Sequence, residues 1–69
     1  MNAAYQYAIW IVRNPDDYGY LHFMNDDYLT RESDYAKLTD QKSAQSDLDN
    51  IRMKSNGLIE GCLIAVRVQ

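Results

Sequence analysis

The sequence predicts an α+β fold, namely a small antiparallel sheet with one helix packed on one face. Three observations predict it. β-Branched and aromatic residues gather near both ends of the chain, turn-forming residues separate them, and a polar stretch in between carries apolar residues at helical spacing. A length of 69 residues fits one domain, residues 1–69. The expected order of elements is β-β-(β)-α-β.

The first two strands are expected at residues 5–13 (YQYAIWIVR) and 19–24 (GYLHFM), which are rich in the residue types that strands prefer. Residues 14–19 (NPDDYG) carry a strong turn signal. Proline fixes φ, aspartate bonds to its own backbone, and glycine tolerates positive φ. We expect an antiparallel hairpin with a loop of about five residues.

The middle of the chain gives weaker signals. Residues 25–27 (NDD) form a second turn, and residues 28–29 and 35–38 are candidates for short extended pieces around residues 30–34. Whether residues 28–38 join the sheet or form a loop is left open by the sequence.

A helix is expected to begin at Thr39 or Asp40, because either side chain can cap the free N–H groups of a first helical turn. One apolar stripe follows at spacings of four and three residues: Ala44, Leu48 and Ile51. Asn56-Gly57 supplies the left-handed residue that ends a helix.

Residues 58–68 (LIEGCLIAVRV) predict a long closing strand. Side chains alternate across a strand, so the first and last strands are apolar on both faces. One helix with a narrow stripe can cover one face only. The other face is expected to be covered by residues 28–38, by a second copy of the chain, or by a partner.

Aromatic residues are abundant for this length, with six tyrosines and one tryptophan. These types are enriched at the energetic centres of protein interfaces. Tyr5, Tyr7 and Trp10 are therefore candidates for a dimer or partner face.

Composition narrows the function classes. The chain has a net charge of −3, and four of its eight aspartates form the doublets Asp16-Asp17 and Asp26-Asp27. Such a surface disfavours direct nucleic-acid binding and suits a protein partner with a basic surface. The lone Cys62 cannot form an internal disulfide, and the longest apolar run is too short to span a bilayer. These features predict a cytoplasmic location and no membrane partner.

No catalytic, metal or cofactor site is expected. A chain this short has little room for a catalytic cavity. His22 is the one histidine, and Cys62 is expected to be buried and inert within an apolar strand. The two aspartate doublets flank a strand and would lie roughly 20 Å apart, too far to share one cation. The sequence therefore predicts a protein that is not an enzyme.

The acidic turns, with tyrosines beside them, suggest a mimic of a nucleic-acid backbone. Carboxylates would stand where phosphates stand and pair with Arg or Lys of a nucleic-acid-binding protein. The candidate partner-binding residues are Asp16, Asp17, Tyr18, Tyr20, Asp26, Asp27 and Tyr28.

Three runs cover nearly the whole chain: YAIWIVRNPDDYGYLHF (residues 7–23), YLTRESDYAKLTDQKSAQSDLDNIR (28–52) and LIEGCLIAVRV (58–68). Their pattern resembles a class of small phage proteins with an opening "YxI" strand, a "GYL" strand, a capped helix with an early alanine (here Ala44) and a Val/Ile-rich last strand. The resemblance implies an inhibitor of a bacterial defence nuclease, similar to anti-CRISPR proteins. It transfers no functional residue, and a net charge of −3 is modest beside strongly acidic DNA mimics.

The leading hypothesis is thus a phage-derived inhibitor that docks through its acidic turns and an aromatic surface onto a host nucleic-acid-handling protein, a nuclease or a CRISPR effector, in the host cytoplasm. The alternative is a small structural or accessory module that homodimerises through the uncovered sheet face.

Overall fold

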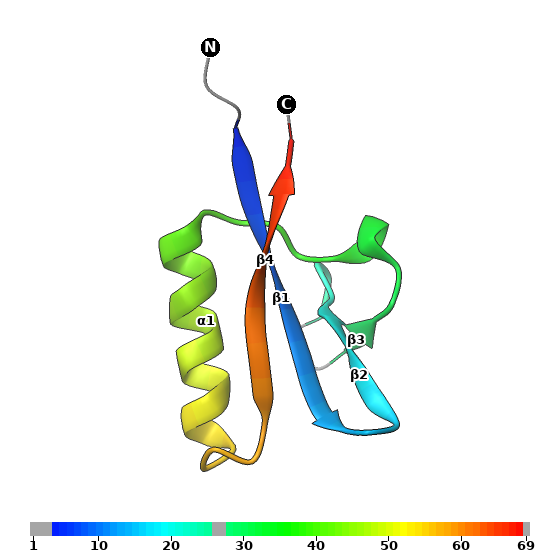
Figure 1. The fold of residues 1–69 in the computed structure, drawn as a ribbon, viewed down its shortest axis with the longest axis vertical. Coiled ribbons are helices and arrows are strands. Elements are labelled where there is room, and N and C mark those ends of the chain that lie inside the picture. Colours follow the sequence, from blue (N-terminus) through cyan, green and yellow to red (C-terminus); the bar gives the residue numbers. More distant parts are fainter. Residues whose placement is uncertain (1–3, 26–27, 69) are drawn as a thin grey trace.

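The computed structural model describes residues 4–25 and 28–68, which form a four-stranded antiparallel sheet of order β3-β2-β1-β4 with a helix on one face (Figure 1). In chain order the elements are β1 (Tyr5–Asn14), β2 (Asp17–Leu21), β3 (Leu29–Thr30), the 3-10 turn η1 (Ser33–Tyr35), α1 (Gln41–Lys54) and β4 (Glu60–Arg67). The predicted α+β class is confirmed.

The β1–β2 hairpin is tighter than predicted. Asn14 pairs with Asp17, so Pro15 and Asp16 alone form the loop, and the Asn14 Oδ1 atom accepts a hydrogen bond from the Asp16 N–H (2.9 Å). The predicted loop of about five residues was wrong. Gly19, predicted both to end the turn and to begin the second strand, is buried within β2.

A glycine is required at position 19 because the neighbouring strand β3 approaches its backbone closely. A Cβ atom at this position would lie 2.6 Å from the Thr30 carbonyl oxygen of β3, well inside van der Waals contact. Its φ of 153° also disfavours other residues. The glycine therefore serves strand packing and not the hairpin turn.

The middle segment joins the sheet. Leu29 and Thr30 pair with β2, confirming an extended piece there. After η1 the chain returns between β2 and β1, where Ala36 forms a bridge with His22 and Thr39 forms one with Tyr7. The backbones of Tyr7 and Thr39 exchange two hydrogen bonds, of 2.7 and 3.1 Å. This return segment thus fills the space where β1 and β2 separate.

Local signals set both ends of α1 as predicted. Asp40 is the N-cap, and its carboxylate accepts a hydrogen bond from the Ser43 N–H (3.1 Å). Hydrogen bonds from Ser43, and a weaker one from Thr39, lower the pKa of the Asp40 carboxyl below its usual value. At the other end, Asn56 and Gly57 take left-handed φ values of 56° and 78°.

The core lies between α1 and the sheet. α1 lies beside β4 and β1, whereas β2 and β3 extend away from it (Figure 1). Gly61 of β4 leaves room for the helix, because a Cβ there would meet the Leu48 Cδ1 atom at 2.8 Å. The buried side chains of this core are Ile9, Ile11, Leu21, Ala44 and Leu48. Within residues 4–25 and 28–68, no helix combines the length and apolar character needed to cross a bilayer.

The opposite side of the sheet, here called the open face, carries no helix among the described residues. Strand alternation and the pairing register place these side chains on it: Ala8, Trp10, Val12, Tyr18, Tyr20, Cys62, Ile64 and Val66. Of the three expected covers, residues 28–38 provide a partial one. The Arg31 guanidinium lies 4.1 Å from the centre of the Tyr18 ring, and the Tyr35 ring stacks on His22.

Candidate interaction surface

Aromatic side chains run along the open-face side of β2. Tyr18 and Tyr20 of β2 alternate with His22, which follows the end of the strand, and Trp10 packs against the two tyrosines from β1. The Trp10 ring meets Tyr20 edge-on, with centroids 4.9 Å apart, and lies 5.9 Å from Tyr18. Tilted and edge-on contacts of this kind favour a fixed arrangement of the rings. The result is a row of aromatic side chains in mutual contact on the open face.

This row ends in a cluster that we call the aromatic end: His22, Phe23, Met24, Tyr28 and Tyr35. The His22, Phe23 and Tyr35 rings are nearly parallel, and His22 lies 5.0 Å from Phe23 and 5.8 Å from Tyr35 between centroids. The exposed fractions of the four apolar members are 54% for Phe23, 76% for Met24, 65% for Tyr28 and 48% for Tyr35. Large apolar side chains gathered at a surface usually mark an interaction site.

Backbone hydrogen bonds hold the aromatic end in place. The Phe23 N–H donates to the Tyr35 carbonyl (2.9 Å), and the His22 N–H donates to the Tyr28 carbonyl (3.1 Å). The His22 Nδ1 atom accepts from the Met24 N–H (3.0 Å). His22 thus holds the loop through its ring nitrogen as well as through its backbone.

The structure describes two of the four predicted acidic residues. Asp16 is exposed at the tip of the β1–β2 hairpin, while Asp17 forms an ion pair with Arg13 (3.4 Å). Arg31 adds positive charge over the neighbouring Tyr18 ring. Asp26 and Asp27 lie outside the described residues. The hairpin end therefore carries charges of both signs, and Asp17 shares its charge with Arg13 whereas Asp16 is exposed at the tip.

Tyr5, Tyr7 and Trp10, predicted to share a dimer or partner face, lie on two different faces. Tyr7 packs against the core on the helix side of the sheet, and Tyr5 has the same orientation in β1. Trp10 points to the open face. Of the three, Trp10 alone belongs to the aromatic row.

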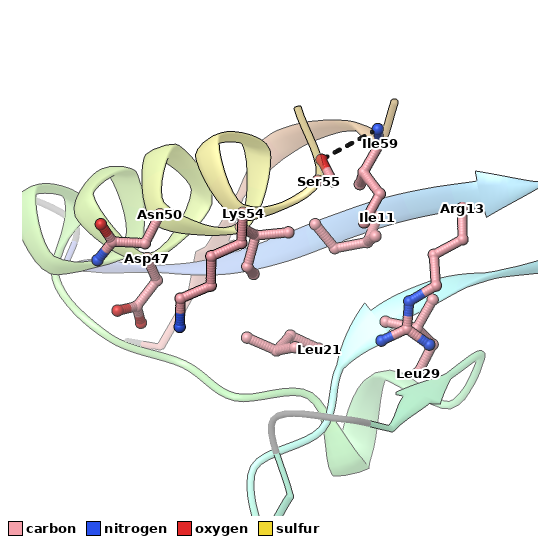
Figure 2. Close-up of a pocket in the computed structure, with 10 residues that line it drawn as sticks. Ile11, Arg13, Leu21, Leu29, Asp47, Asn50, Lys54, Ser55 and Ile59 are labelled. Carbon is pink, nitrogen blue, oxygen red and sulfur yellow. Dashed lines mark hydrogen bonds between the residues drawn. The ribbon is translucent and has the colours of Figure 1, made fainter. Parts of the chain in front are cut away.

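A groove of about 480 Å³ lies on the helix side, between α1 and the β2–β3 pair (Figure 2). Its apolar lining consists of Ile11, Leu21, Leu29, Ile51 and Ile59. Arg13 and Lys54 stand on opposite sides of it, and Asp47 on the helix is paired with Lys37 (3.1 Å). Ile11 and Leu21 are almost fully buried, so the groove offers less accessible apolar surface than the aromatic end.

Cys62 is exposed on β4, which corrects the expectation that it is buried. It lies opposite Trp10, whose other neighbour is Tyr20, so β1 separates Cys62 from His22, which follows the end of β2. Two strand spacings are about 10 Å, too far for a Cys–His pair. Across residues 4–25 and 28–68, no three His, Cys, Asp or Glu side chains gather as metal ligands.

Sequence reasoning identified Tyr18, Tyr20 and Tyr28 but missed Phe23, Met24 and Tyr35. Phe23 and Met24 were assigned to a strand, whereas β2 ends at Leu21 and leaves both in the exposed loop. The hydrophobic run gave no indication of this early end. Tyr35 pairs with Phe23 through a contact between distant segments, which local sequence patterns do not reveal.

No protein-family model matches the chain, and neither a curated protein nor a solved structure shows significant similarity to it.

Proposed function

We propose that this chain is a non-enzymatic protein-binding module that docks on another protein through the aromatic end and the adjoining open face. The observation that supports this best is the exposure of Phe23, Met24, Tyr28 and Tyr35 in one hydrogen-bonded cluster. Interfaces concentrate their binding energy in a few such aromatic side chains. The same cluster contains no arrangement of acid, base and nucleophile that would suit catalysis.

The proposed partner is a protein with a basic, nucleic-acid-binding surface. The net charge of −3 and the exposed Asp16 would accelerate encounter with such a surface. The resemblance to small phage inhibitors favours a host defence protein, so the proposed activity is inhibition by occupying a nucleic-acid site. In this scheme the rings provide most of the affinity and the carboxylates mainly raise the association rate.

The aromatic part is tested with three immobilised proteins: the wild type, a Phe23→Ser/Tyr35→Ser variant, and a Met53→Ser control that removes an even more exposed apolar side chain from α1. Bacterial lysate is passed over each, and the partner found is then titrated. We expect the wild type and control to retain the same basic protein and the double variant to bind it more than tenfold more weakly. Equal retention by the double variant would refute the aromatic site.

The electrostatic part is tested by Asp16→Asn, with Asp49→Asn on α1 as the control for loss of one negative charge. Asp16→Asn should weaken binding by roughly twofold to fivefold at low salt and reduce its salt dependence. If both variants behave alike, net charge rather than the hairpin carboxylate governs binding. The larger replacement of Asp16, Asp17, Asp26 and Asp27 by Asn should flatten the salt dependence further, and an unchanged affinity would exclude electrostatic docking.

A further inference from the structure

The outer edge of β4 is long and lacks several of the features that commonly protect a sheet edge. β4 is the last strand of the sheet order and pairs with β1 in one unbroken register, from Tyr5–Arg67 to Val12–Glu60. Its eight residues (EGCLIAVR) include no proline and no lysine, and the register shows no bulge. Natural proteins use these devices to prevent edge pairing.

The direction of the backbone groups follows from the ladder. The Val68 N–H donates to the Ala4 carbonyl (3.1 Å), which makes residues 4 and 68 a hydrogen-bonded pair. Bonded pairs alternate in an antiparallel ladder, so the backbone groups of Gly61, Leu63 and Ala65 point away from β1. The Gly61 carbonyl agrees with this, because it accepts a hydrogen bond from the Arg52 Nη2 atom outside the sheet (2.6 Å).

Arg52 therefore caps one end of the edge, while its centre is open. Within the described part of the chain, the outward backbone groups of Leu63 and Ala65 have no hydrogen-bond partner. These two residues provide two N–H donors and two carbonyl acceptors in alternation. Such an edge is complementary to another strand running in the opposite direction.

We propose that the occupant of this edge is a second copy of the chain, which pairs its own β4 antiparallel to the first and forms a continuous eight-stranded sheet. A two-fold axis at Ile64 places Leu63 opposite Ala65 of the second copy. The pairing supplies four backbone hydrogen bonds, since each Leu63–Ala65 pair contributes two. The Gly61 carbonyl can keep its bond to Arg52.

The placement of charge favours a second copy with this orientation. The charged residues of β4 are Glu60 at its start and Arg67 at its end, on opposite faces of the sheet. Antiparallel pairing puts Glu60 of one copy and Arg67 of the other at the same end of the contact, whereas a parallel arrangement would put like charges at the same end. On the open face, the exposed Cys62 would lie opposite Val66 of the second copy, which removes apolar surface from water.

This dimer is independent of the proposed protein-binding function. The aromatic end lies around β2 and β3, at the other side of the sheet, and stays accessible when two β4 strands pair. A variant that abolishes dimerisation should therefore still bind a partner through the aromatic end. Conversely, Phe23→Ser/Tyr35→Ser should dimerise like the wild type.

The decisive comparison is between Ala65→Pro and Ala65→Thr. The Ala65 N–H points to the free edge, so proline removes an outward donor without breaking the ladder to β1, whereas threonine keeps that donor. Analytical ultracentrifugation from 10 µM to 1 mM (chosen as about the span of weak dimers) should show dimers for the wild type and Ala65→Thr. Ala65→Pro should be a folded monomer by circular dichroism.

Two outcomes would overturn the proposal. A wild type that stays monomeric throughout this concentration range excludes the dimer. A folded Ala65→Pro variant that still dimerises shows that another surface, such as the open face, forms the contact.

Oxidation of Cys62 tests the proposed strand register of the dimer. With the axis at Ile64, the two Cys62 residues are four positions apart along the paired strands, so their Cα atoms lie roughly 14 Å apart. This exceeds the distance that a disulfide can bridge. Mild oxidation should leave the wild-type dimer without an intermolecular disulfide, and rapid crosslinking would refute this register.

Discussion

The two edges of the sheet differ in length and in how they end. β3 has two residues, and the chain leaves the sheet at once into η1, so little backbone is offered to another strand. β4 has eight residues in unbroken register and one capped carbonyl. The short edge ends in aromatic side chains, and the long one offers backbone groups. One small sheet can thus present two kinds of binding surface. One offers aromatic side chains, and the other offers the backbone hydrogen-bonding groups of an edge strand.

The two edges should also differ in their contribution to stability, because α1 packs beside β4 and not beside β3. Leu48→Ala removes a buried side chain of α1 and should cost about 2–5 kcal/mol, comparable to the whole stability of a domain this small. Leu29→Ala, at a half-buried position of β3, should cost about 1–2 kcal/mol. Urea denaturation of both variants measures the difference, and equal costs would show that the core extends evenly across the sheet.

Gly19→Ala should detach the short edge selectively. The added Cβ would meet the Thr30 carbonyl at a distance where backbone must move, at a cost of about 1–3 kcal/mol. Hydrogen exchange measured by NMR should show faster exchange at amides of the β2–β3 pair. The amides of the β1–β4 pair should lose only the protection that corresponds to the loss of global stability. If protection falls uniformly, β3 is part of a single cooperative unit with the rest of the sheet.

Asp40→Ala should weaken the helix that supports the long edge. Loss of the N-cap should lower Tm by roughly 4–8 °C at neutral pH. The folded-state pKa of Asp40 lies below its unfolded value of 3.8, so the contribution of the charged cap is present above that value and is lost as the pH falls through the lower folded pKa.

The difference in Tm between the wild type and Asp40→Ala should therefore shrink when the pH is lowered from about 5 to about 3. Asp40→Asn is the matched control, because an amide caps a helix without titrating. A difference that is independent of pH would show that the carboxylate charge has no role in the cap.

Arg52→Ala is expected to have the smallest effect on stability. It removes one exposed hydrogen bond to the Gly61 carbonyl, worth about 0.5–1 kcal/mol. The same change uncovers a further acceptor on the β4 edge, so self-association should stay equal or increase. A clear loss of self-association would show that Arg52 takes part in the dimer contact, in addition to its hydrogen bond to the Gly61 carbonyl.

The helix was predictable because its signals are local: Asp40 caps its first turn, and Asn56-Gly57 ends it. The hairpin loop was mispredicted because a glycine can serve either a turn or the close packing of two strands. Gly19 is needed because β3 approaches it closely, and this approach depends on residues further along the chain. The order of the strands, and with it the open β4 edge, depends on pairing between distant segments in the same way. At the candidate site, the tyrosines were recognised by type, but Phe23 and Met24 look like core residues until β2 is seen to end before them.

The position of β4 beside β1 also has consequences for the speed and order of folding. These strands stand at opposite ends of the chain, so β1 cannot gain its longest partner until nearly all residues are available. Closing so large a loop has an entropic cost that local hairpins avoid, and chains with such distant contacts fold slowly for their size. During synthesis, β1 could pair only with β2 at first. Its other edge would stay unpaired until β4 has been made.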